Sequence, residues 1–106
     1  MESSALELIL CTAPEGEAEA IARMIIEERH AACVNITHVR SVYRWDGEVV
    51  VDNEQLLICK TTADRRGDLI RRIEEIHSYD LPEVLALSIG DGSAPYLAWV
   101  KSEVSG

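Results

Sequence analysis

The feature that most constrains the fold is a long β-pattern with a turn in its middle. Apolar and polar residues alternate from Cys33 onward, Asp46-Gly47 interrupts them, and a second run continues from about Glu48 to Thr61. Asp and Gly tolerate the positive φ angles of a two-residue type I′ turn, so the pattern predicts a β-hairpin. The return arm of about 14 residues is much longer than the average strand of about 5–6. Two helices cannot cover such arms, and a projecting strand edge favours pairing with another chain.

The hydrophobic phase changes within the first arm of this hairpin. Val34 and Ile36 share one parity, whereas Tyr43 and Trp45 occupy the other. A change of phase inside one strand predicts a bulge or a sharp bend near residues 37–40.

The segments around the hairpin alternate between strand and helix patterns. A short apolar run at 5–11 predicts a buried strand, and Thr12 with Glu15 forms a capping-box pattern that predicts a helix starting there, with Pro14 in its first turn. The inward stripe expected for that helix comprises Ala18, Ile21, Ala22, Ile25 and Arg29.

The C-terminal half repeats this alternation. A second helix is expected over 64–76 with an inward stripe, a fourth strand over 84–89, and a last short helix starting at Pro95. The stripe comprises Leu69, Ile70, Ile73, Ile76 and His77. Right-handed crossovers then predict an α+β fold: a ferredoxin-like βαββαβ antiparallel sheet with a long hairpin between its second and third strands and an extra C-terminal helix, all in one domain spanning 1–106.

Charge and cysteine usage restrict the partners and the compartment. The formal net charge of −9 disfavours nucleic acid. Three cysteines without CxxC spacing argue against a disulfide framework and favour a reducing compartment. The start of the chain, Met1–Ser4, has no basic region, and the apolar run after it is short, so we expect neither a signal peptide nor a membrane span. We therefore expect a cytoplasmic protein with no membrane partner.

Several segments together resemble the CutA family. They follow the family order from about Leu8 to Val100, and they are Cys11–Glu15, Ala31–Asn35, Tyr43–Gly47, Lys60–Thr62, His77–Glu83 and Tyr96–Trp99. The resemblance implies a homotrimer whose long hairpins join sheets between subunits, a role in divalent-cation tolerance, and copper as the bound ion. Because the family fold is similar to that of the trimeric PII signalling proteins, a small molecule or protein partner bound between subunits is the alternative.

The resemblance also implies a metal site, from which this chain departs twice. The family's copper ligands map onto Cys11 and His77, but Ile76 stands where the family has a further histidine. Ser78 stands where the family commonly has proline. Serine, unlike proline, has a backbone N–H donor. Glu83 is a candidate oxygen ligand, so the expected metal set is Cys11, His77 and Glu83.

Each of these ligands has an alternative role, and the alternative for Glu83 is simply to face water. Cys11, at the end of a strand and facing a helix N-terminus, could be a thiolate of lowered pKa that binds a soft metal, or a small buried hydrophobe. His77 could be a ligand or could cap the end of its helix. We expect Cys33 and Cys59 to pack in the core, and His30 and His38 to be structural or exposed.

No catalytic residues or organic cofactor are expected. The loop after the first strand has no Arg to cradle an anion, and no P-loop, zinc motif or nucleophile–base spacing is present. An RNA-recognition sheet would need exposed aromatics and positive charge, and this chain has no Phe. The aromatics present could pack between subunits or line a small-molecule cleft, and they include Tyr43, Trp45, Tyr96 and Trp99.

Overall fold

The computed structural model describes residues 5–105 and arranges them as one sheet with helices around it. Over this range the elements are β1 (Leu6–Ala13), α1 (Ala18–Glu27), β2 (Cys33–Trp45), β3 (Glu48–Thr62), the 3-10 turn η1 (Ala63–Arg65), α2 (Arg66–Ile76), β4 (Val84–Ser88) and α3 (Ala94–Val104). The strand order is β2-β3-β1-β4, and all neighbouring strands are antiparallel. The ferredoxin-like α+β prediction is therefore confirmed, including the long hairpin and the extra helix.

Two predictions concern the chain as a whole. The prediction that Met1–Ser4 belongs to no signal peptide falls outside the described residues, and the assignment of 1–106 to one domain stays a prediction. Between residues 5 and 105, no helix combines the length and apolar character needed to cross a membrane.

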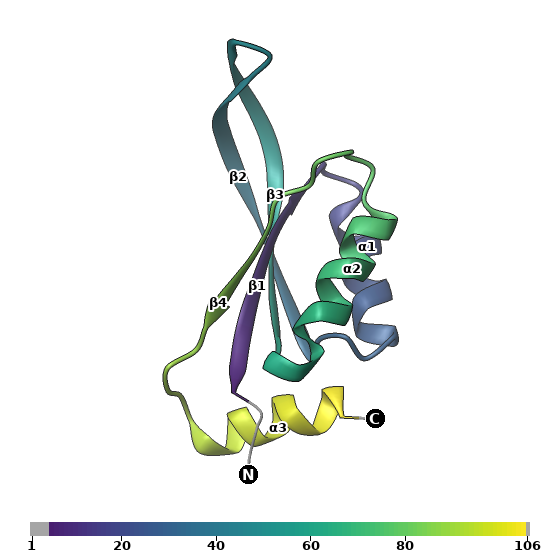
Figure 1. Cartoon of the computed structure of the whole chain (residues 1–106), viewed down its shortest axis with the longest axis vertical. Coiled ribbons are helices and arrows are strands. Elements are labelled where there is room, and N and C mark those ends of the chain that lie inside the picture. Colours follow the sequence, from purple (N-terminus) through teal and green to yellow (C-terminus); the bar gives the residue numbers. More distant parts are fainter. Residues whose placement is uncertain (1–4, 106) are drawn as a thin grey trace.

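The two faces of the sheet have different surroundings. In Figure 1, α1 and α2 lie together beside the sheet, the β2–β3 hairpin extends well beyond both, and α3 lies across the end away from the hairpin tip. The longest dimension of the molecule is 48 Å, against 25 and 21 Å for the other two. We call the side covered by α1 and α2 the helix face, and the other side the open face.

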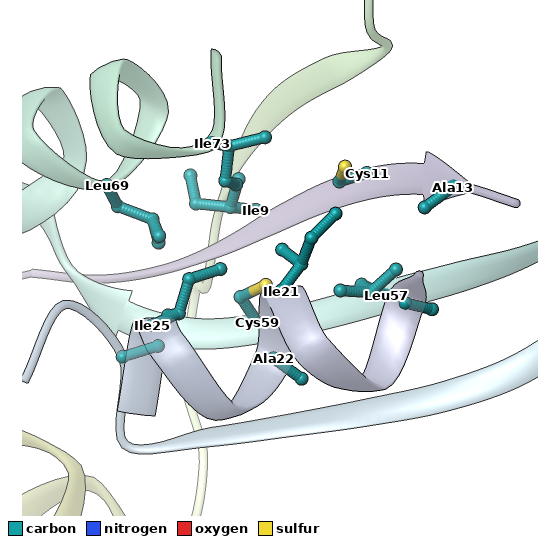
Figure 2. Close-up of a cluster of buried hydrophobic side chains, with 12 residues drawn as sticks. Ile9, Cys11, Ala13, Ile21, Ala22, Ile25, Leu57, Cys59, Leu69 and Ile73 are labelled. Carbon is teal, nitrogen blue, oxygen red and sulfur yellow. The ribbon is translucent and has the colours of Figure 1, made fainter. Parts of the chain in front are cut away.

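The hydrophobic core lies on the helix face. Strand residues of one parity meet the apolar stripes of the two helices there, as Figure 2 shows for Ile9, Cys11, Leu57 and Cys59. The full cluster is Ile9, Cys11, Ala13, Ala18, Ile21, Ala22, Ile25, Ala31, Leu57, Cys59, Leu69 and Ile73. The stripe predicted for α1 is confirmed except for Arg29, because the helix ends at Glu27 and Arg29 has a φ of 61°.

The predicted capping box is wrong. Thr12 continues β1, where it pairs with Leu56, and α1 has Glu17 at its N-cap without a side-chain cap. A turn stands between strand and helix instead, because the N–H groups of Glu17 and Ala18 donate to the Pro14 carbonyl at 3.0 and 3.3 Å. Backbone pairing with β3 thus extends β1 past Thr12, the residue whose side chain suggested a helix cap.

The predicted bulge is also wrong, whereas the hairpin turn is confirmed. The β2–β3 register runs without a slip from Cys33 opposite Lys60 to Trp45 opposite Glu48. Asp46 and Gly47 have φ angles of 51° and 79°, as a turn of this kind requires. The hydrophobic phase changes because the environment changes: the base of β2 faces the helix-side core, and its outer half extends past both helices.

The open face carries a patch of large aliphatic side chains. Cross-strand neighbours share a face, so the register places six residues together, which we call the open-face patch: Leu8, Leu10, Leu56, Ile58, Leu85 and Leu87. Leu85 and Leu87 are 53% and 45% exposed, although both lie within the sheet.

Candidate functional site

The predicted metal ligands lie at the same end of β1, the one nearest the hairpin. Cys11 lies in β1 opposite Val84 and packs in the helix-face core, whereas Glu83, the residue before β4, has the parity of the open face. His77 follows the last residue of α2 and reaches the backbone of Thr12. We call the polar residues gathered here the β1-end cluster: Cys11, Thr12, Glu17, Glu54, His77, Ser78, Tyr79 and Glu83.

Both ring nitrogens of His77 have hydrogen-bond partners. Nε2 lies 2.8 Å from the Thr12 carbonyl oxygen, which can only accept, so Nε2 carries the proton. The backbone N–H of Tyr79 donates to Nδ1 at 3.0 Å, so Nδ1 supplies its lone pair. These partners fix the neutral Nε2–H tautomer. The residue is only 8% exposed.

Cys11 is a buried, protonated thiol. Its Sγ has no exposed surface and donates to the Thr12 carbonyl at 3.6 Å. Burial, helped by the carboxylates of Glu83, Glu17 and Glu54, raises the pKa of Cys11 to about 12. Of the two roles that the sequence left open for Cys11, the structure favours the small buried hydrophobe over the thiolate of lowered pKa, because the thiol packs in the core and α1 begins only at Ala18.

The carboxylates of the cluster each have a hydrogen-bond partner. Glu54 is buried and accepts from the Tyr79 hydroxyl at 3.0 Å, and burial together with this bond raises the pKa of Tyr79 to about 12. Glu83 is exposed and accepts a long 3.5 Å bond from the Thr12 hydroxyl.

Glu17 is bound more tightly than the other two carboxylates. It accepts from the backbone N–H and from the hydroxyl of Ser78, at 2.8 and 2.5 Å. The sequence reading missed Glu17 and Glu54. The only sequence signal for this contact was serine at position 78 in place of the family's proline, since serine supplies both donors.

The remaining cysteines and histidines lie elsewhere. Cys59 packs in the core as predicted, but Cys33 is half-buried with Lys60 Nζ 3.7 Å from its sulfur, so its core assignment is wrong. The parity of β2 explains this, because Cys33 alternates with the core-packed Val34. His38 is exposed, and His30 is partly buried beside Glu28, as expected of histidines outside a metal site.

The arrangement does not fit the copper ion that the resemblance implies. Across residues 5–105, no group of three or more His, Cys, Asp or Glu side chains is placed to hold a metal ion. A soft-metal site needs a thiolate and a free imidazole lone pair. Here Cys11 holds its proton and both nitrogens of His77 are engaged.

Comparisons with known proteins agree on one family. The family model described as CutA1 divalent ion tolerance protein matches residues 7–103. The divalent-cation tolerance protein CutA of Thermus thermophilus is 46% identical over 97 residues, which are 90% of this chain and 94% of that protein. A solved structure of the PII-like protein CutA from Nostoc sp. PCC 7120 has a TM-score of 0.89 and 35% identity, covering 92% of this chain and 96% of that one.

Some relatives are longer. The chloroplastic CutA protein of Arabidopsis thaliana is 43% identical over 97 residues, which are 90% of this chain but 53% of that protein. The chain thus spans about half the length of this plant relative.

Proposed function

The chain belongs to the CutA1 divalent ion tolerance protein family, and we propose that it acts in divalent-cation tolerance as a homotrimer that catalyses no reaction. The observation that carries this proposal is the open-face patch. Six aliphatic side chains on one face of a four-stranded sheet are not covered by α1 or α2. Burial of apolar surface stabilises association by roughly 25 cal/mol per Å². An identical face on a second and a third chain is the cover that the family resemblance predicts.

The hairpin supports the same proposal. Its outer half exposes Val42, Trp45 and Val49 by 64%, 52% and 65%. Among residues 5–105 no strand pairs with the outer edge of β2, since β2 is the last strand of the sheet. Apolar side chains on a projecting edge strand favour contact with another chain over contact with water.

Mass measurement in solution tests the assembly. We expect light scattering to give three times the 11.8 kDa of one chain, and Leu85→Glu to shift the protein to smaller species because it places a charge in the patch. Ile26→Glu is the matched control, since Ile26 is 38% exposed on α1, away from the open face. A wild-type monomer at micromolar concentration would refute the trimer.

Two finer points concern the bound ion and the location. Copper binding through Cys11, His77 and Glu83 is what the family resemblance implies, but it is not part of this proposal, because Cys11 keeps its proton and both nitrogens of His77 are engaged. Metal analysis of protein purified without tags or added ions tests it. We also propose a cytoplasmic location, because all three cysteines are free thiols. Cell fractionation tests that location.

A PII-like ligand-binding role is the second candidate. Glu54, Glu83 and Thr12 share the parity of the open-face patch, so the polar end of that face would lie at a subunit boundary in a trimer. A metabolite bound there would raise the melting temperature without any metal. A broad thermal-shift screen without a hit would count against this role.

A further inference from the structure

We infer that His77 in this chain is a hydrogen-bonding bridge rather than a copper ligand, and that Ser78 and Glu17 form a clasp that stabilises the loop around it. The hydrogen bonds of the bridge and the clasp all lie within one chain, in the β1-end cluster. They do not depend on the trimer, so either proposal can fail while the other stands.

The bridge joins three parts of the chain. Through Nε2–H, His77 binds the Thr12 carbonyl of β1, and through Nδ1 it accepts the Tyr79 N–H of the loop before β4. Its own backbone N–H donates to the Ile73 carbonyl at the end of α2, 3.0 Å away. His77 thus links a strand and a loop through its imidazole and the end of α2 through its backbone.

Metal binding at either nitrogen would break one of these bonds. Binding at Nε2 removes its proton and takes the imidazole donor away from the Thr12 carbonyl. Binding at Nδ1 leaves the Tyr79 N–H without its acceptor. Buried polar groups that lose their hydrogen-bond partners destabilise the folded state. His77 is only 8% exposed, so water cannot readily replace the lost partner.

The clasp occupies the carboxylate nearest to the imidazole. Glu17 Oε2 lies 3.8 Å from His77 Nδ1, close enough to help bind a cation held by that nitrogen. That oxygen already accepts the Ser78 N–H at 2.8 Å, and Oε1 accepts the Ser78 hydroxyl at 2.5 Å. The clasp also ties the turn before α1 to the loop after α2, which closes the helix side of the cluster.

The two departures from the family pattern therefore act together. Ile76 replaces a ligand with an apolar side chain that packs against the core. Ser78 replaces a residue that lacks an N–H with one that donates twice to Glu17. The first change removes a donor to copper, and the second stabilises the loop around the histidine that remains.

Copper titration of the tag-free protein tests the bridge. We compare wild type, His77→Gln and His38→Gln by calorimetry and Cu(II) electron paramagnetic resonance in a glycine-containing buffer. His38 is the matched control because its side chain is 73% exposed. We expect wild type and His77→Gln to bind copper equally within about twofold. One copper per chain with nitrogen couplings that vanish in His77→Gln and persist in His38→Gln would overturn the inference.

A structural readout accompanies the titration. His77→Ala should lower the melting temperature, and His77→Gln should restore part of the loss, because a Gln amide can donate to the Thr12 carbonyl but binds metal poorly. Nitrogen-15 NMR should show the Nε2–H tautomer of His77 near pH 7. The Nδ1–H tautomer would contradict the hydrogen bonds of His77 with Thr12 and Tyr79.

The clasp has its own test in a double-mutant cycle. Glu17→Ala and Ser78→Ala should each lower the melting temperature, and the double variant should lose less than the sum, because both remove the same bond between side chains. Arg23→Ala is the control for Ser78→Ala, since Arg23 pairs with Glu19 on the exposed surface of α1. Additive losses for Glu17 and Ser78 would show that the clasp does not exist in solution.

Discussion

Raising the pH above 9 should destabilise the protein through its two buried thiols. Burial raises the pKa of Cys11 and of Cys59 from 9.0 to about 12. Between these values the unfolded chain has released both protons while the folded chain still holds them. The folded state then binds more protons, so the free energy of unfolding falls as the pH rises. Below about pH 9 both states are protonated, and the stabilisation is fully present.

The magnitude follows from proton linkage. With an unfolded pKa near 9, each thiol should remove about 1.4 kcal/mol from the free energy of unfolding between about pH 8 and pH 10. The two thiols together should remove about 2.7 kcal/mol. The Tyr79 hydroxyl, whose pKa is raised to about 12, adds a smaller loss at higher pH because the residue is 37% exposed.

Urea unfolding at fixed protein concentration measures this loss, with the free energy extrapolated to water at each pH. Cys11→Ala and Cys59→Ala should each halve the drop between about pH 8 and pH 10. Cys33→Ala serves as the control for removing a half-buried thiol outside the core. A wild-type protein equally stable at both pH values, or single variants with the wild-type slope, would show that the thiols are not held protonated by the fold.

Three further perturbations test the packing and the turn by the same urea measurement. Leu57→Ala should cost about 2–5 kcal/mol because Leu57 is fully buried, whereas Leu81→Ala, at a residue 70% exposed, should stay within about 0.5 kcal/mol of wild type. Arg66→Ala should cost about 1–3 kcal/mol by removing the 2.6 Å partner of buried Glu7, and adding Glu7→Gln should recover part of it. Gly47→Ala should cost about 1 kcal/mol because φ is 79° there, and a neutral effect would refute the strained turn.

Local sequence patterns predicted the elements well wherever a single segment decides the outcome. The 3.6-residue spacing in α1 identified its buried face, and Asp46-Gly47 identified the hairpin turn. The errors arose where a distant strand decides. Thr12 resembles a helix cap, but pairing with Leu56 keeps it in β1. Likewise, the hydrophobic phase of β2 changes with its surroundings, while its register stays regular.

The site was predicted only in part for the same reason. Sequence motifs identified Cys11, His77 and Glu83 as candidate metal ligands, and the structure places all three residues at one end of β1. What those groups can do depends on Glu17 and Glu54, whose partners Ser78 and Tyr79 lie 61 and 25 positions away in the chain. No spacing rule links residues so far apart, so the protonation of the thiol and the tautomer of the imidazole became visible only in three dimensions.

The length of the β2–β3 hairpin has a consequence for amide exchange with deuterated water. Amides of the β1–β3 ladder lie over the core and should exchange only when the whole domain opens. Near the Val42–Val51 pair, both side chains are more than half exposed, so strand opening there disrupts little within one chain. If assembly covers the outer hairpin, exchange of its amides should slow as the protein concentration rises. The exchange rate of each of these amides would then measure how far assembly stabilises the chain at that residue.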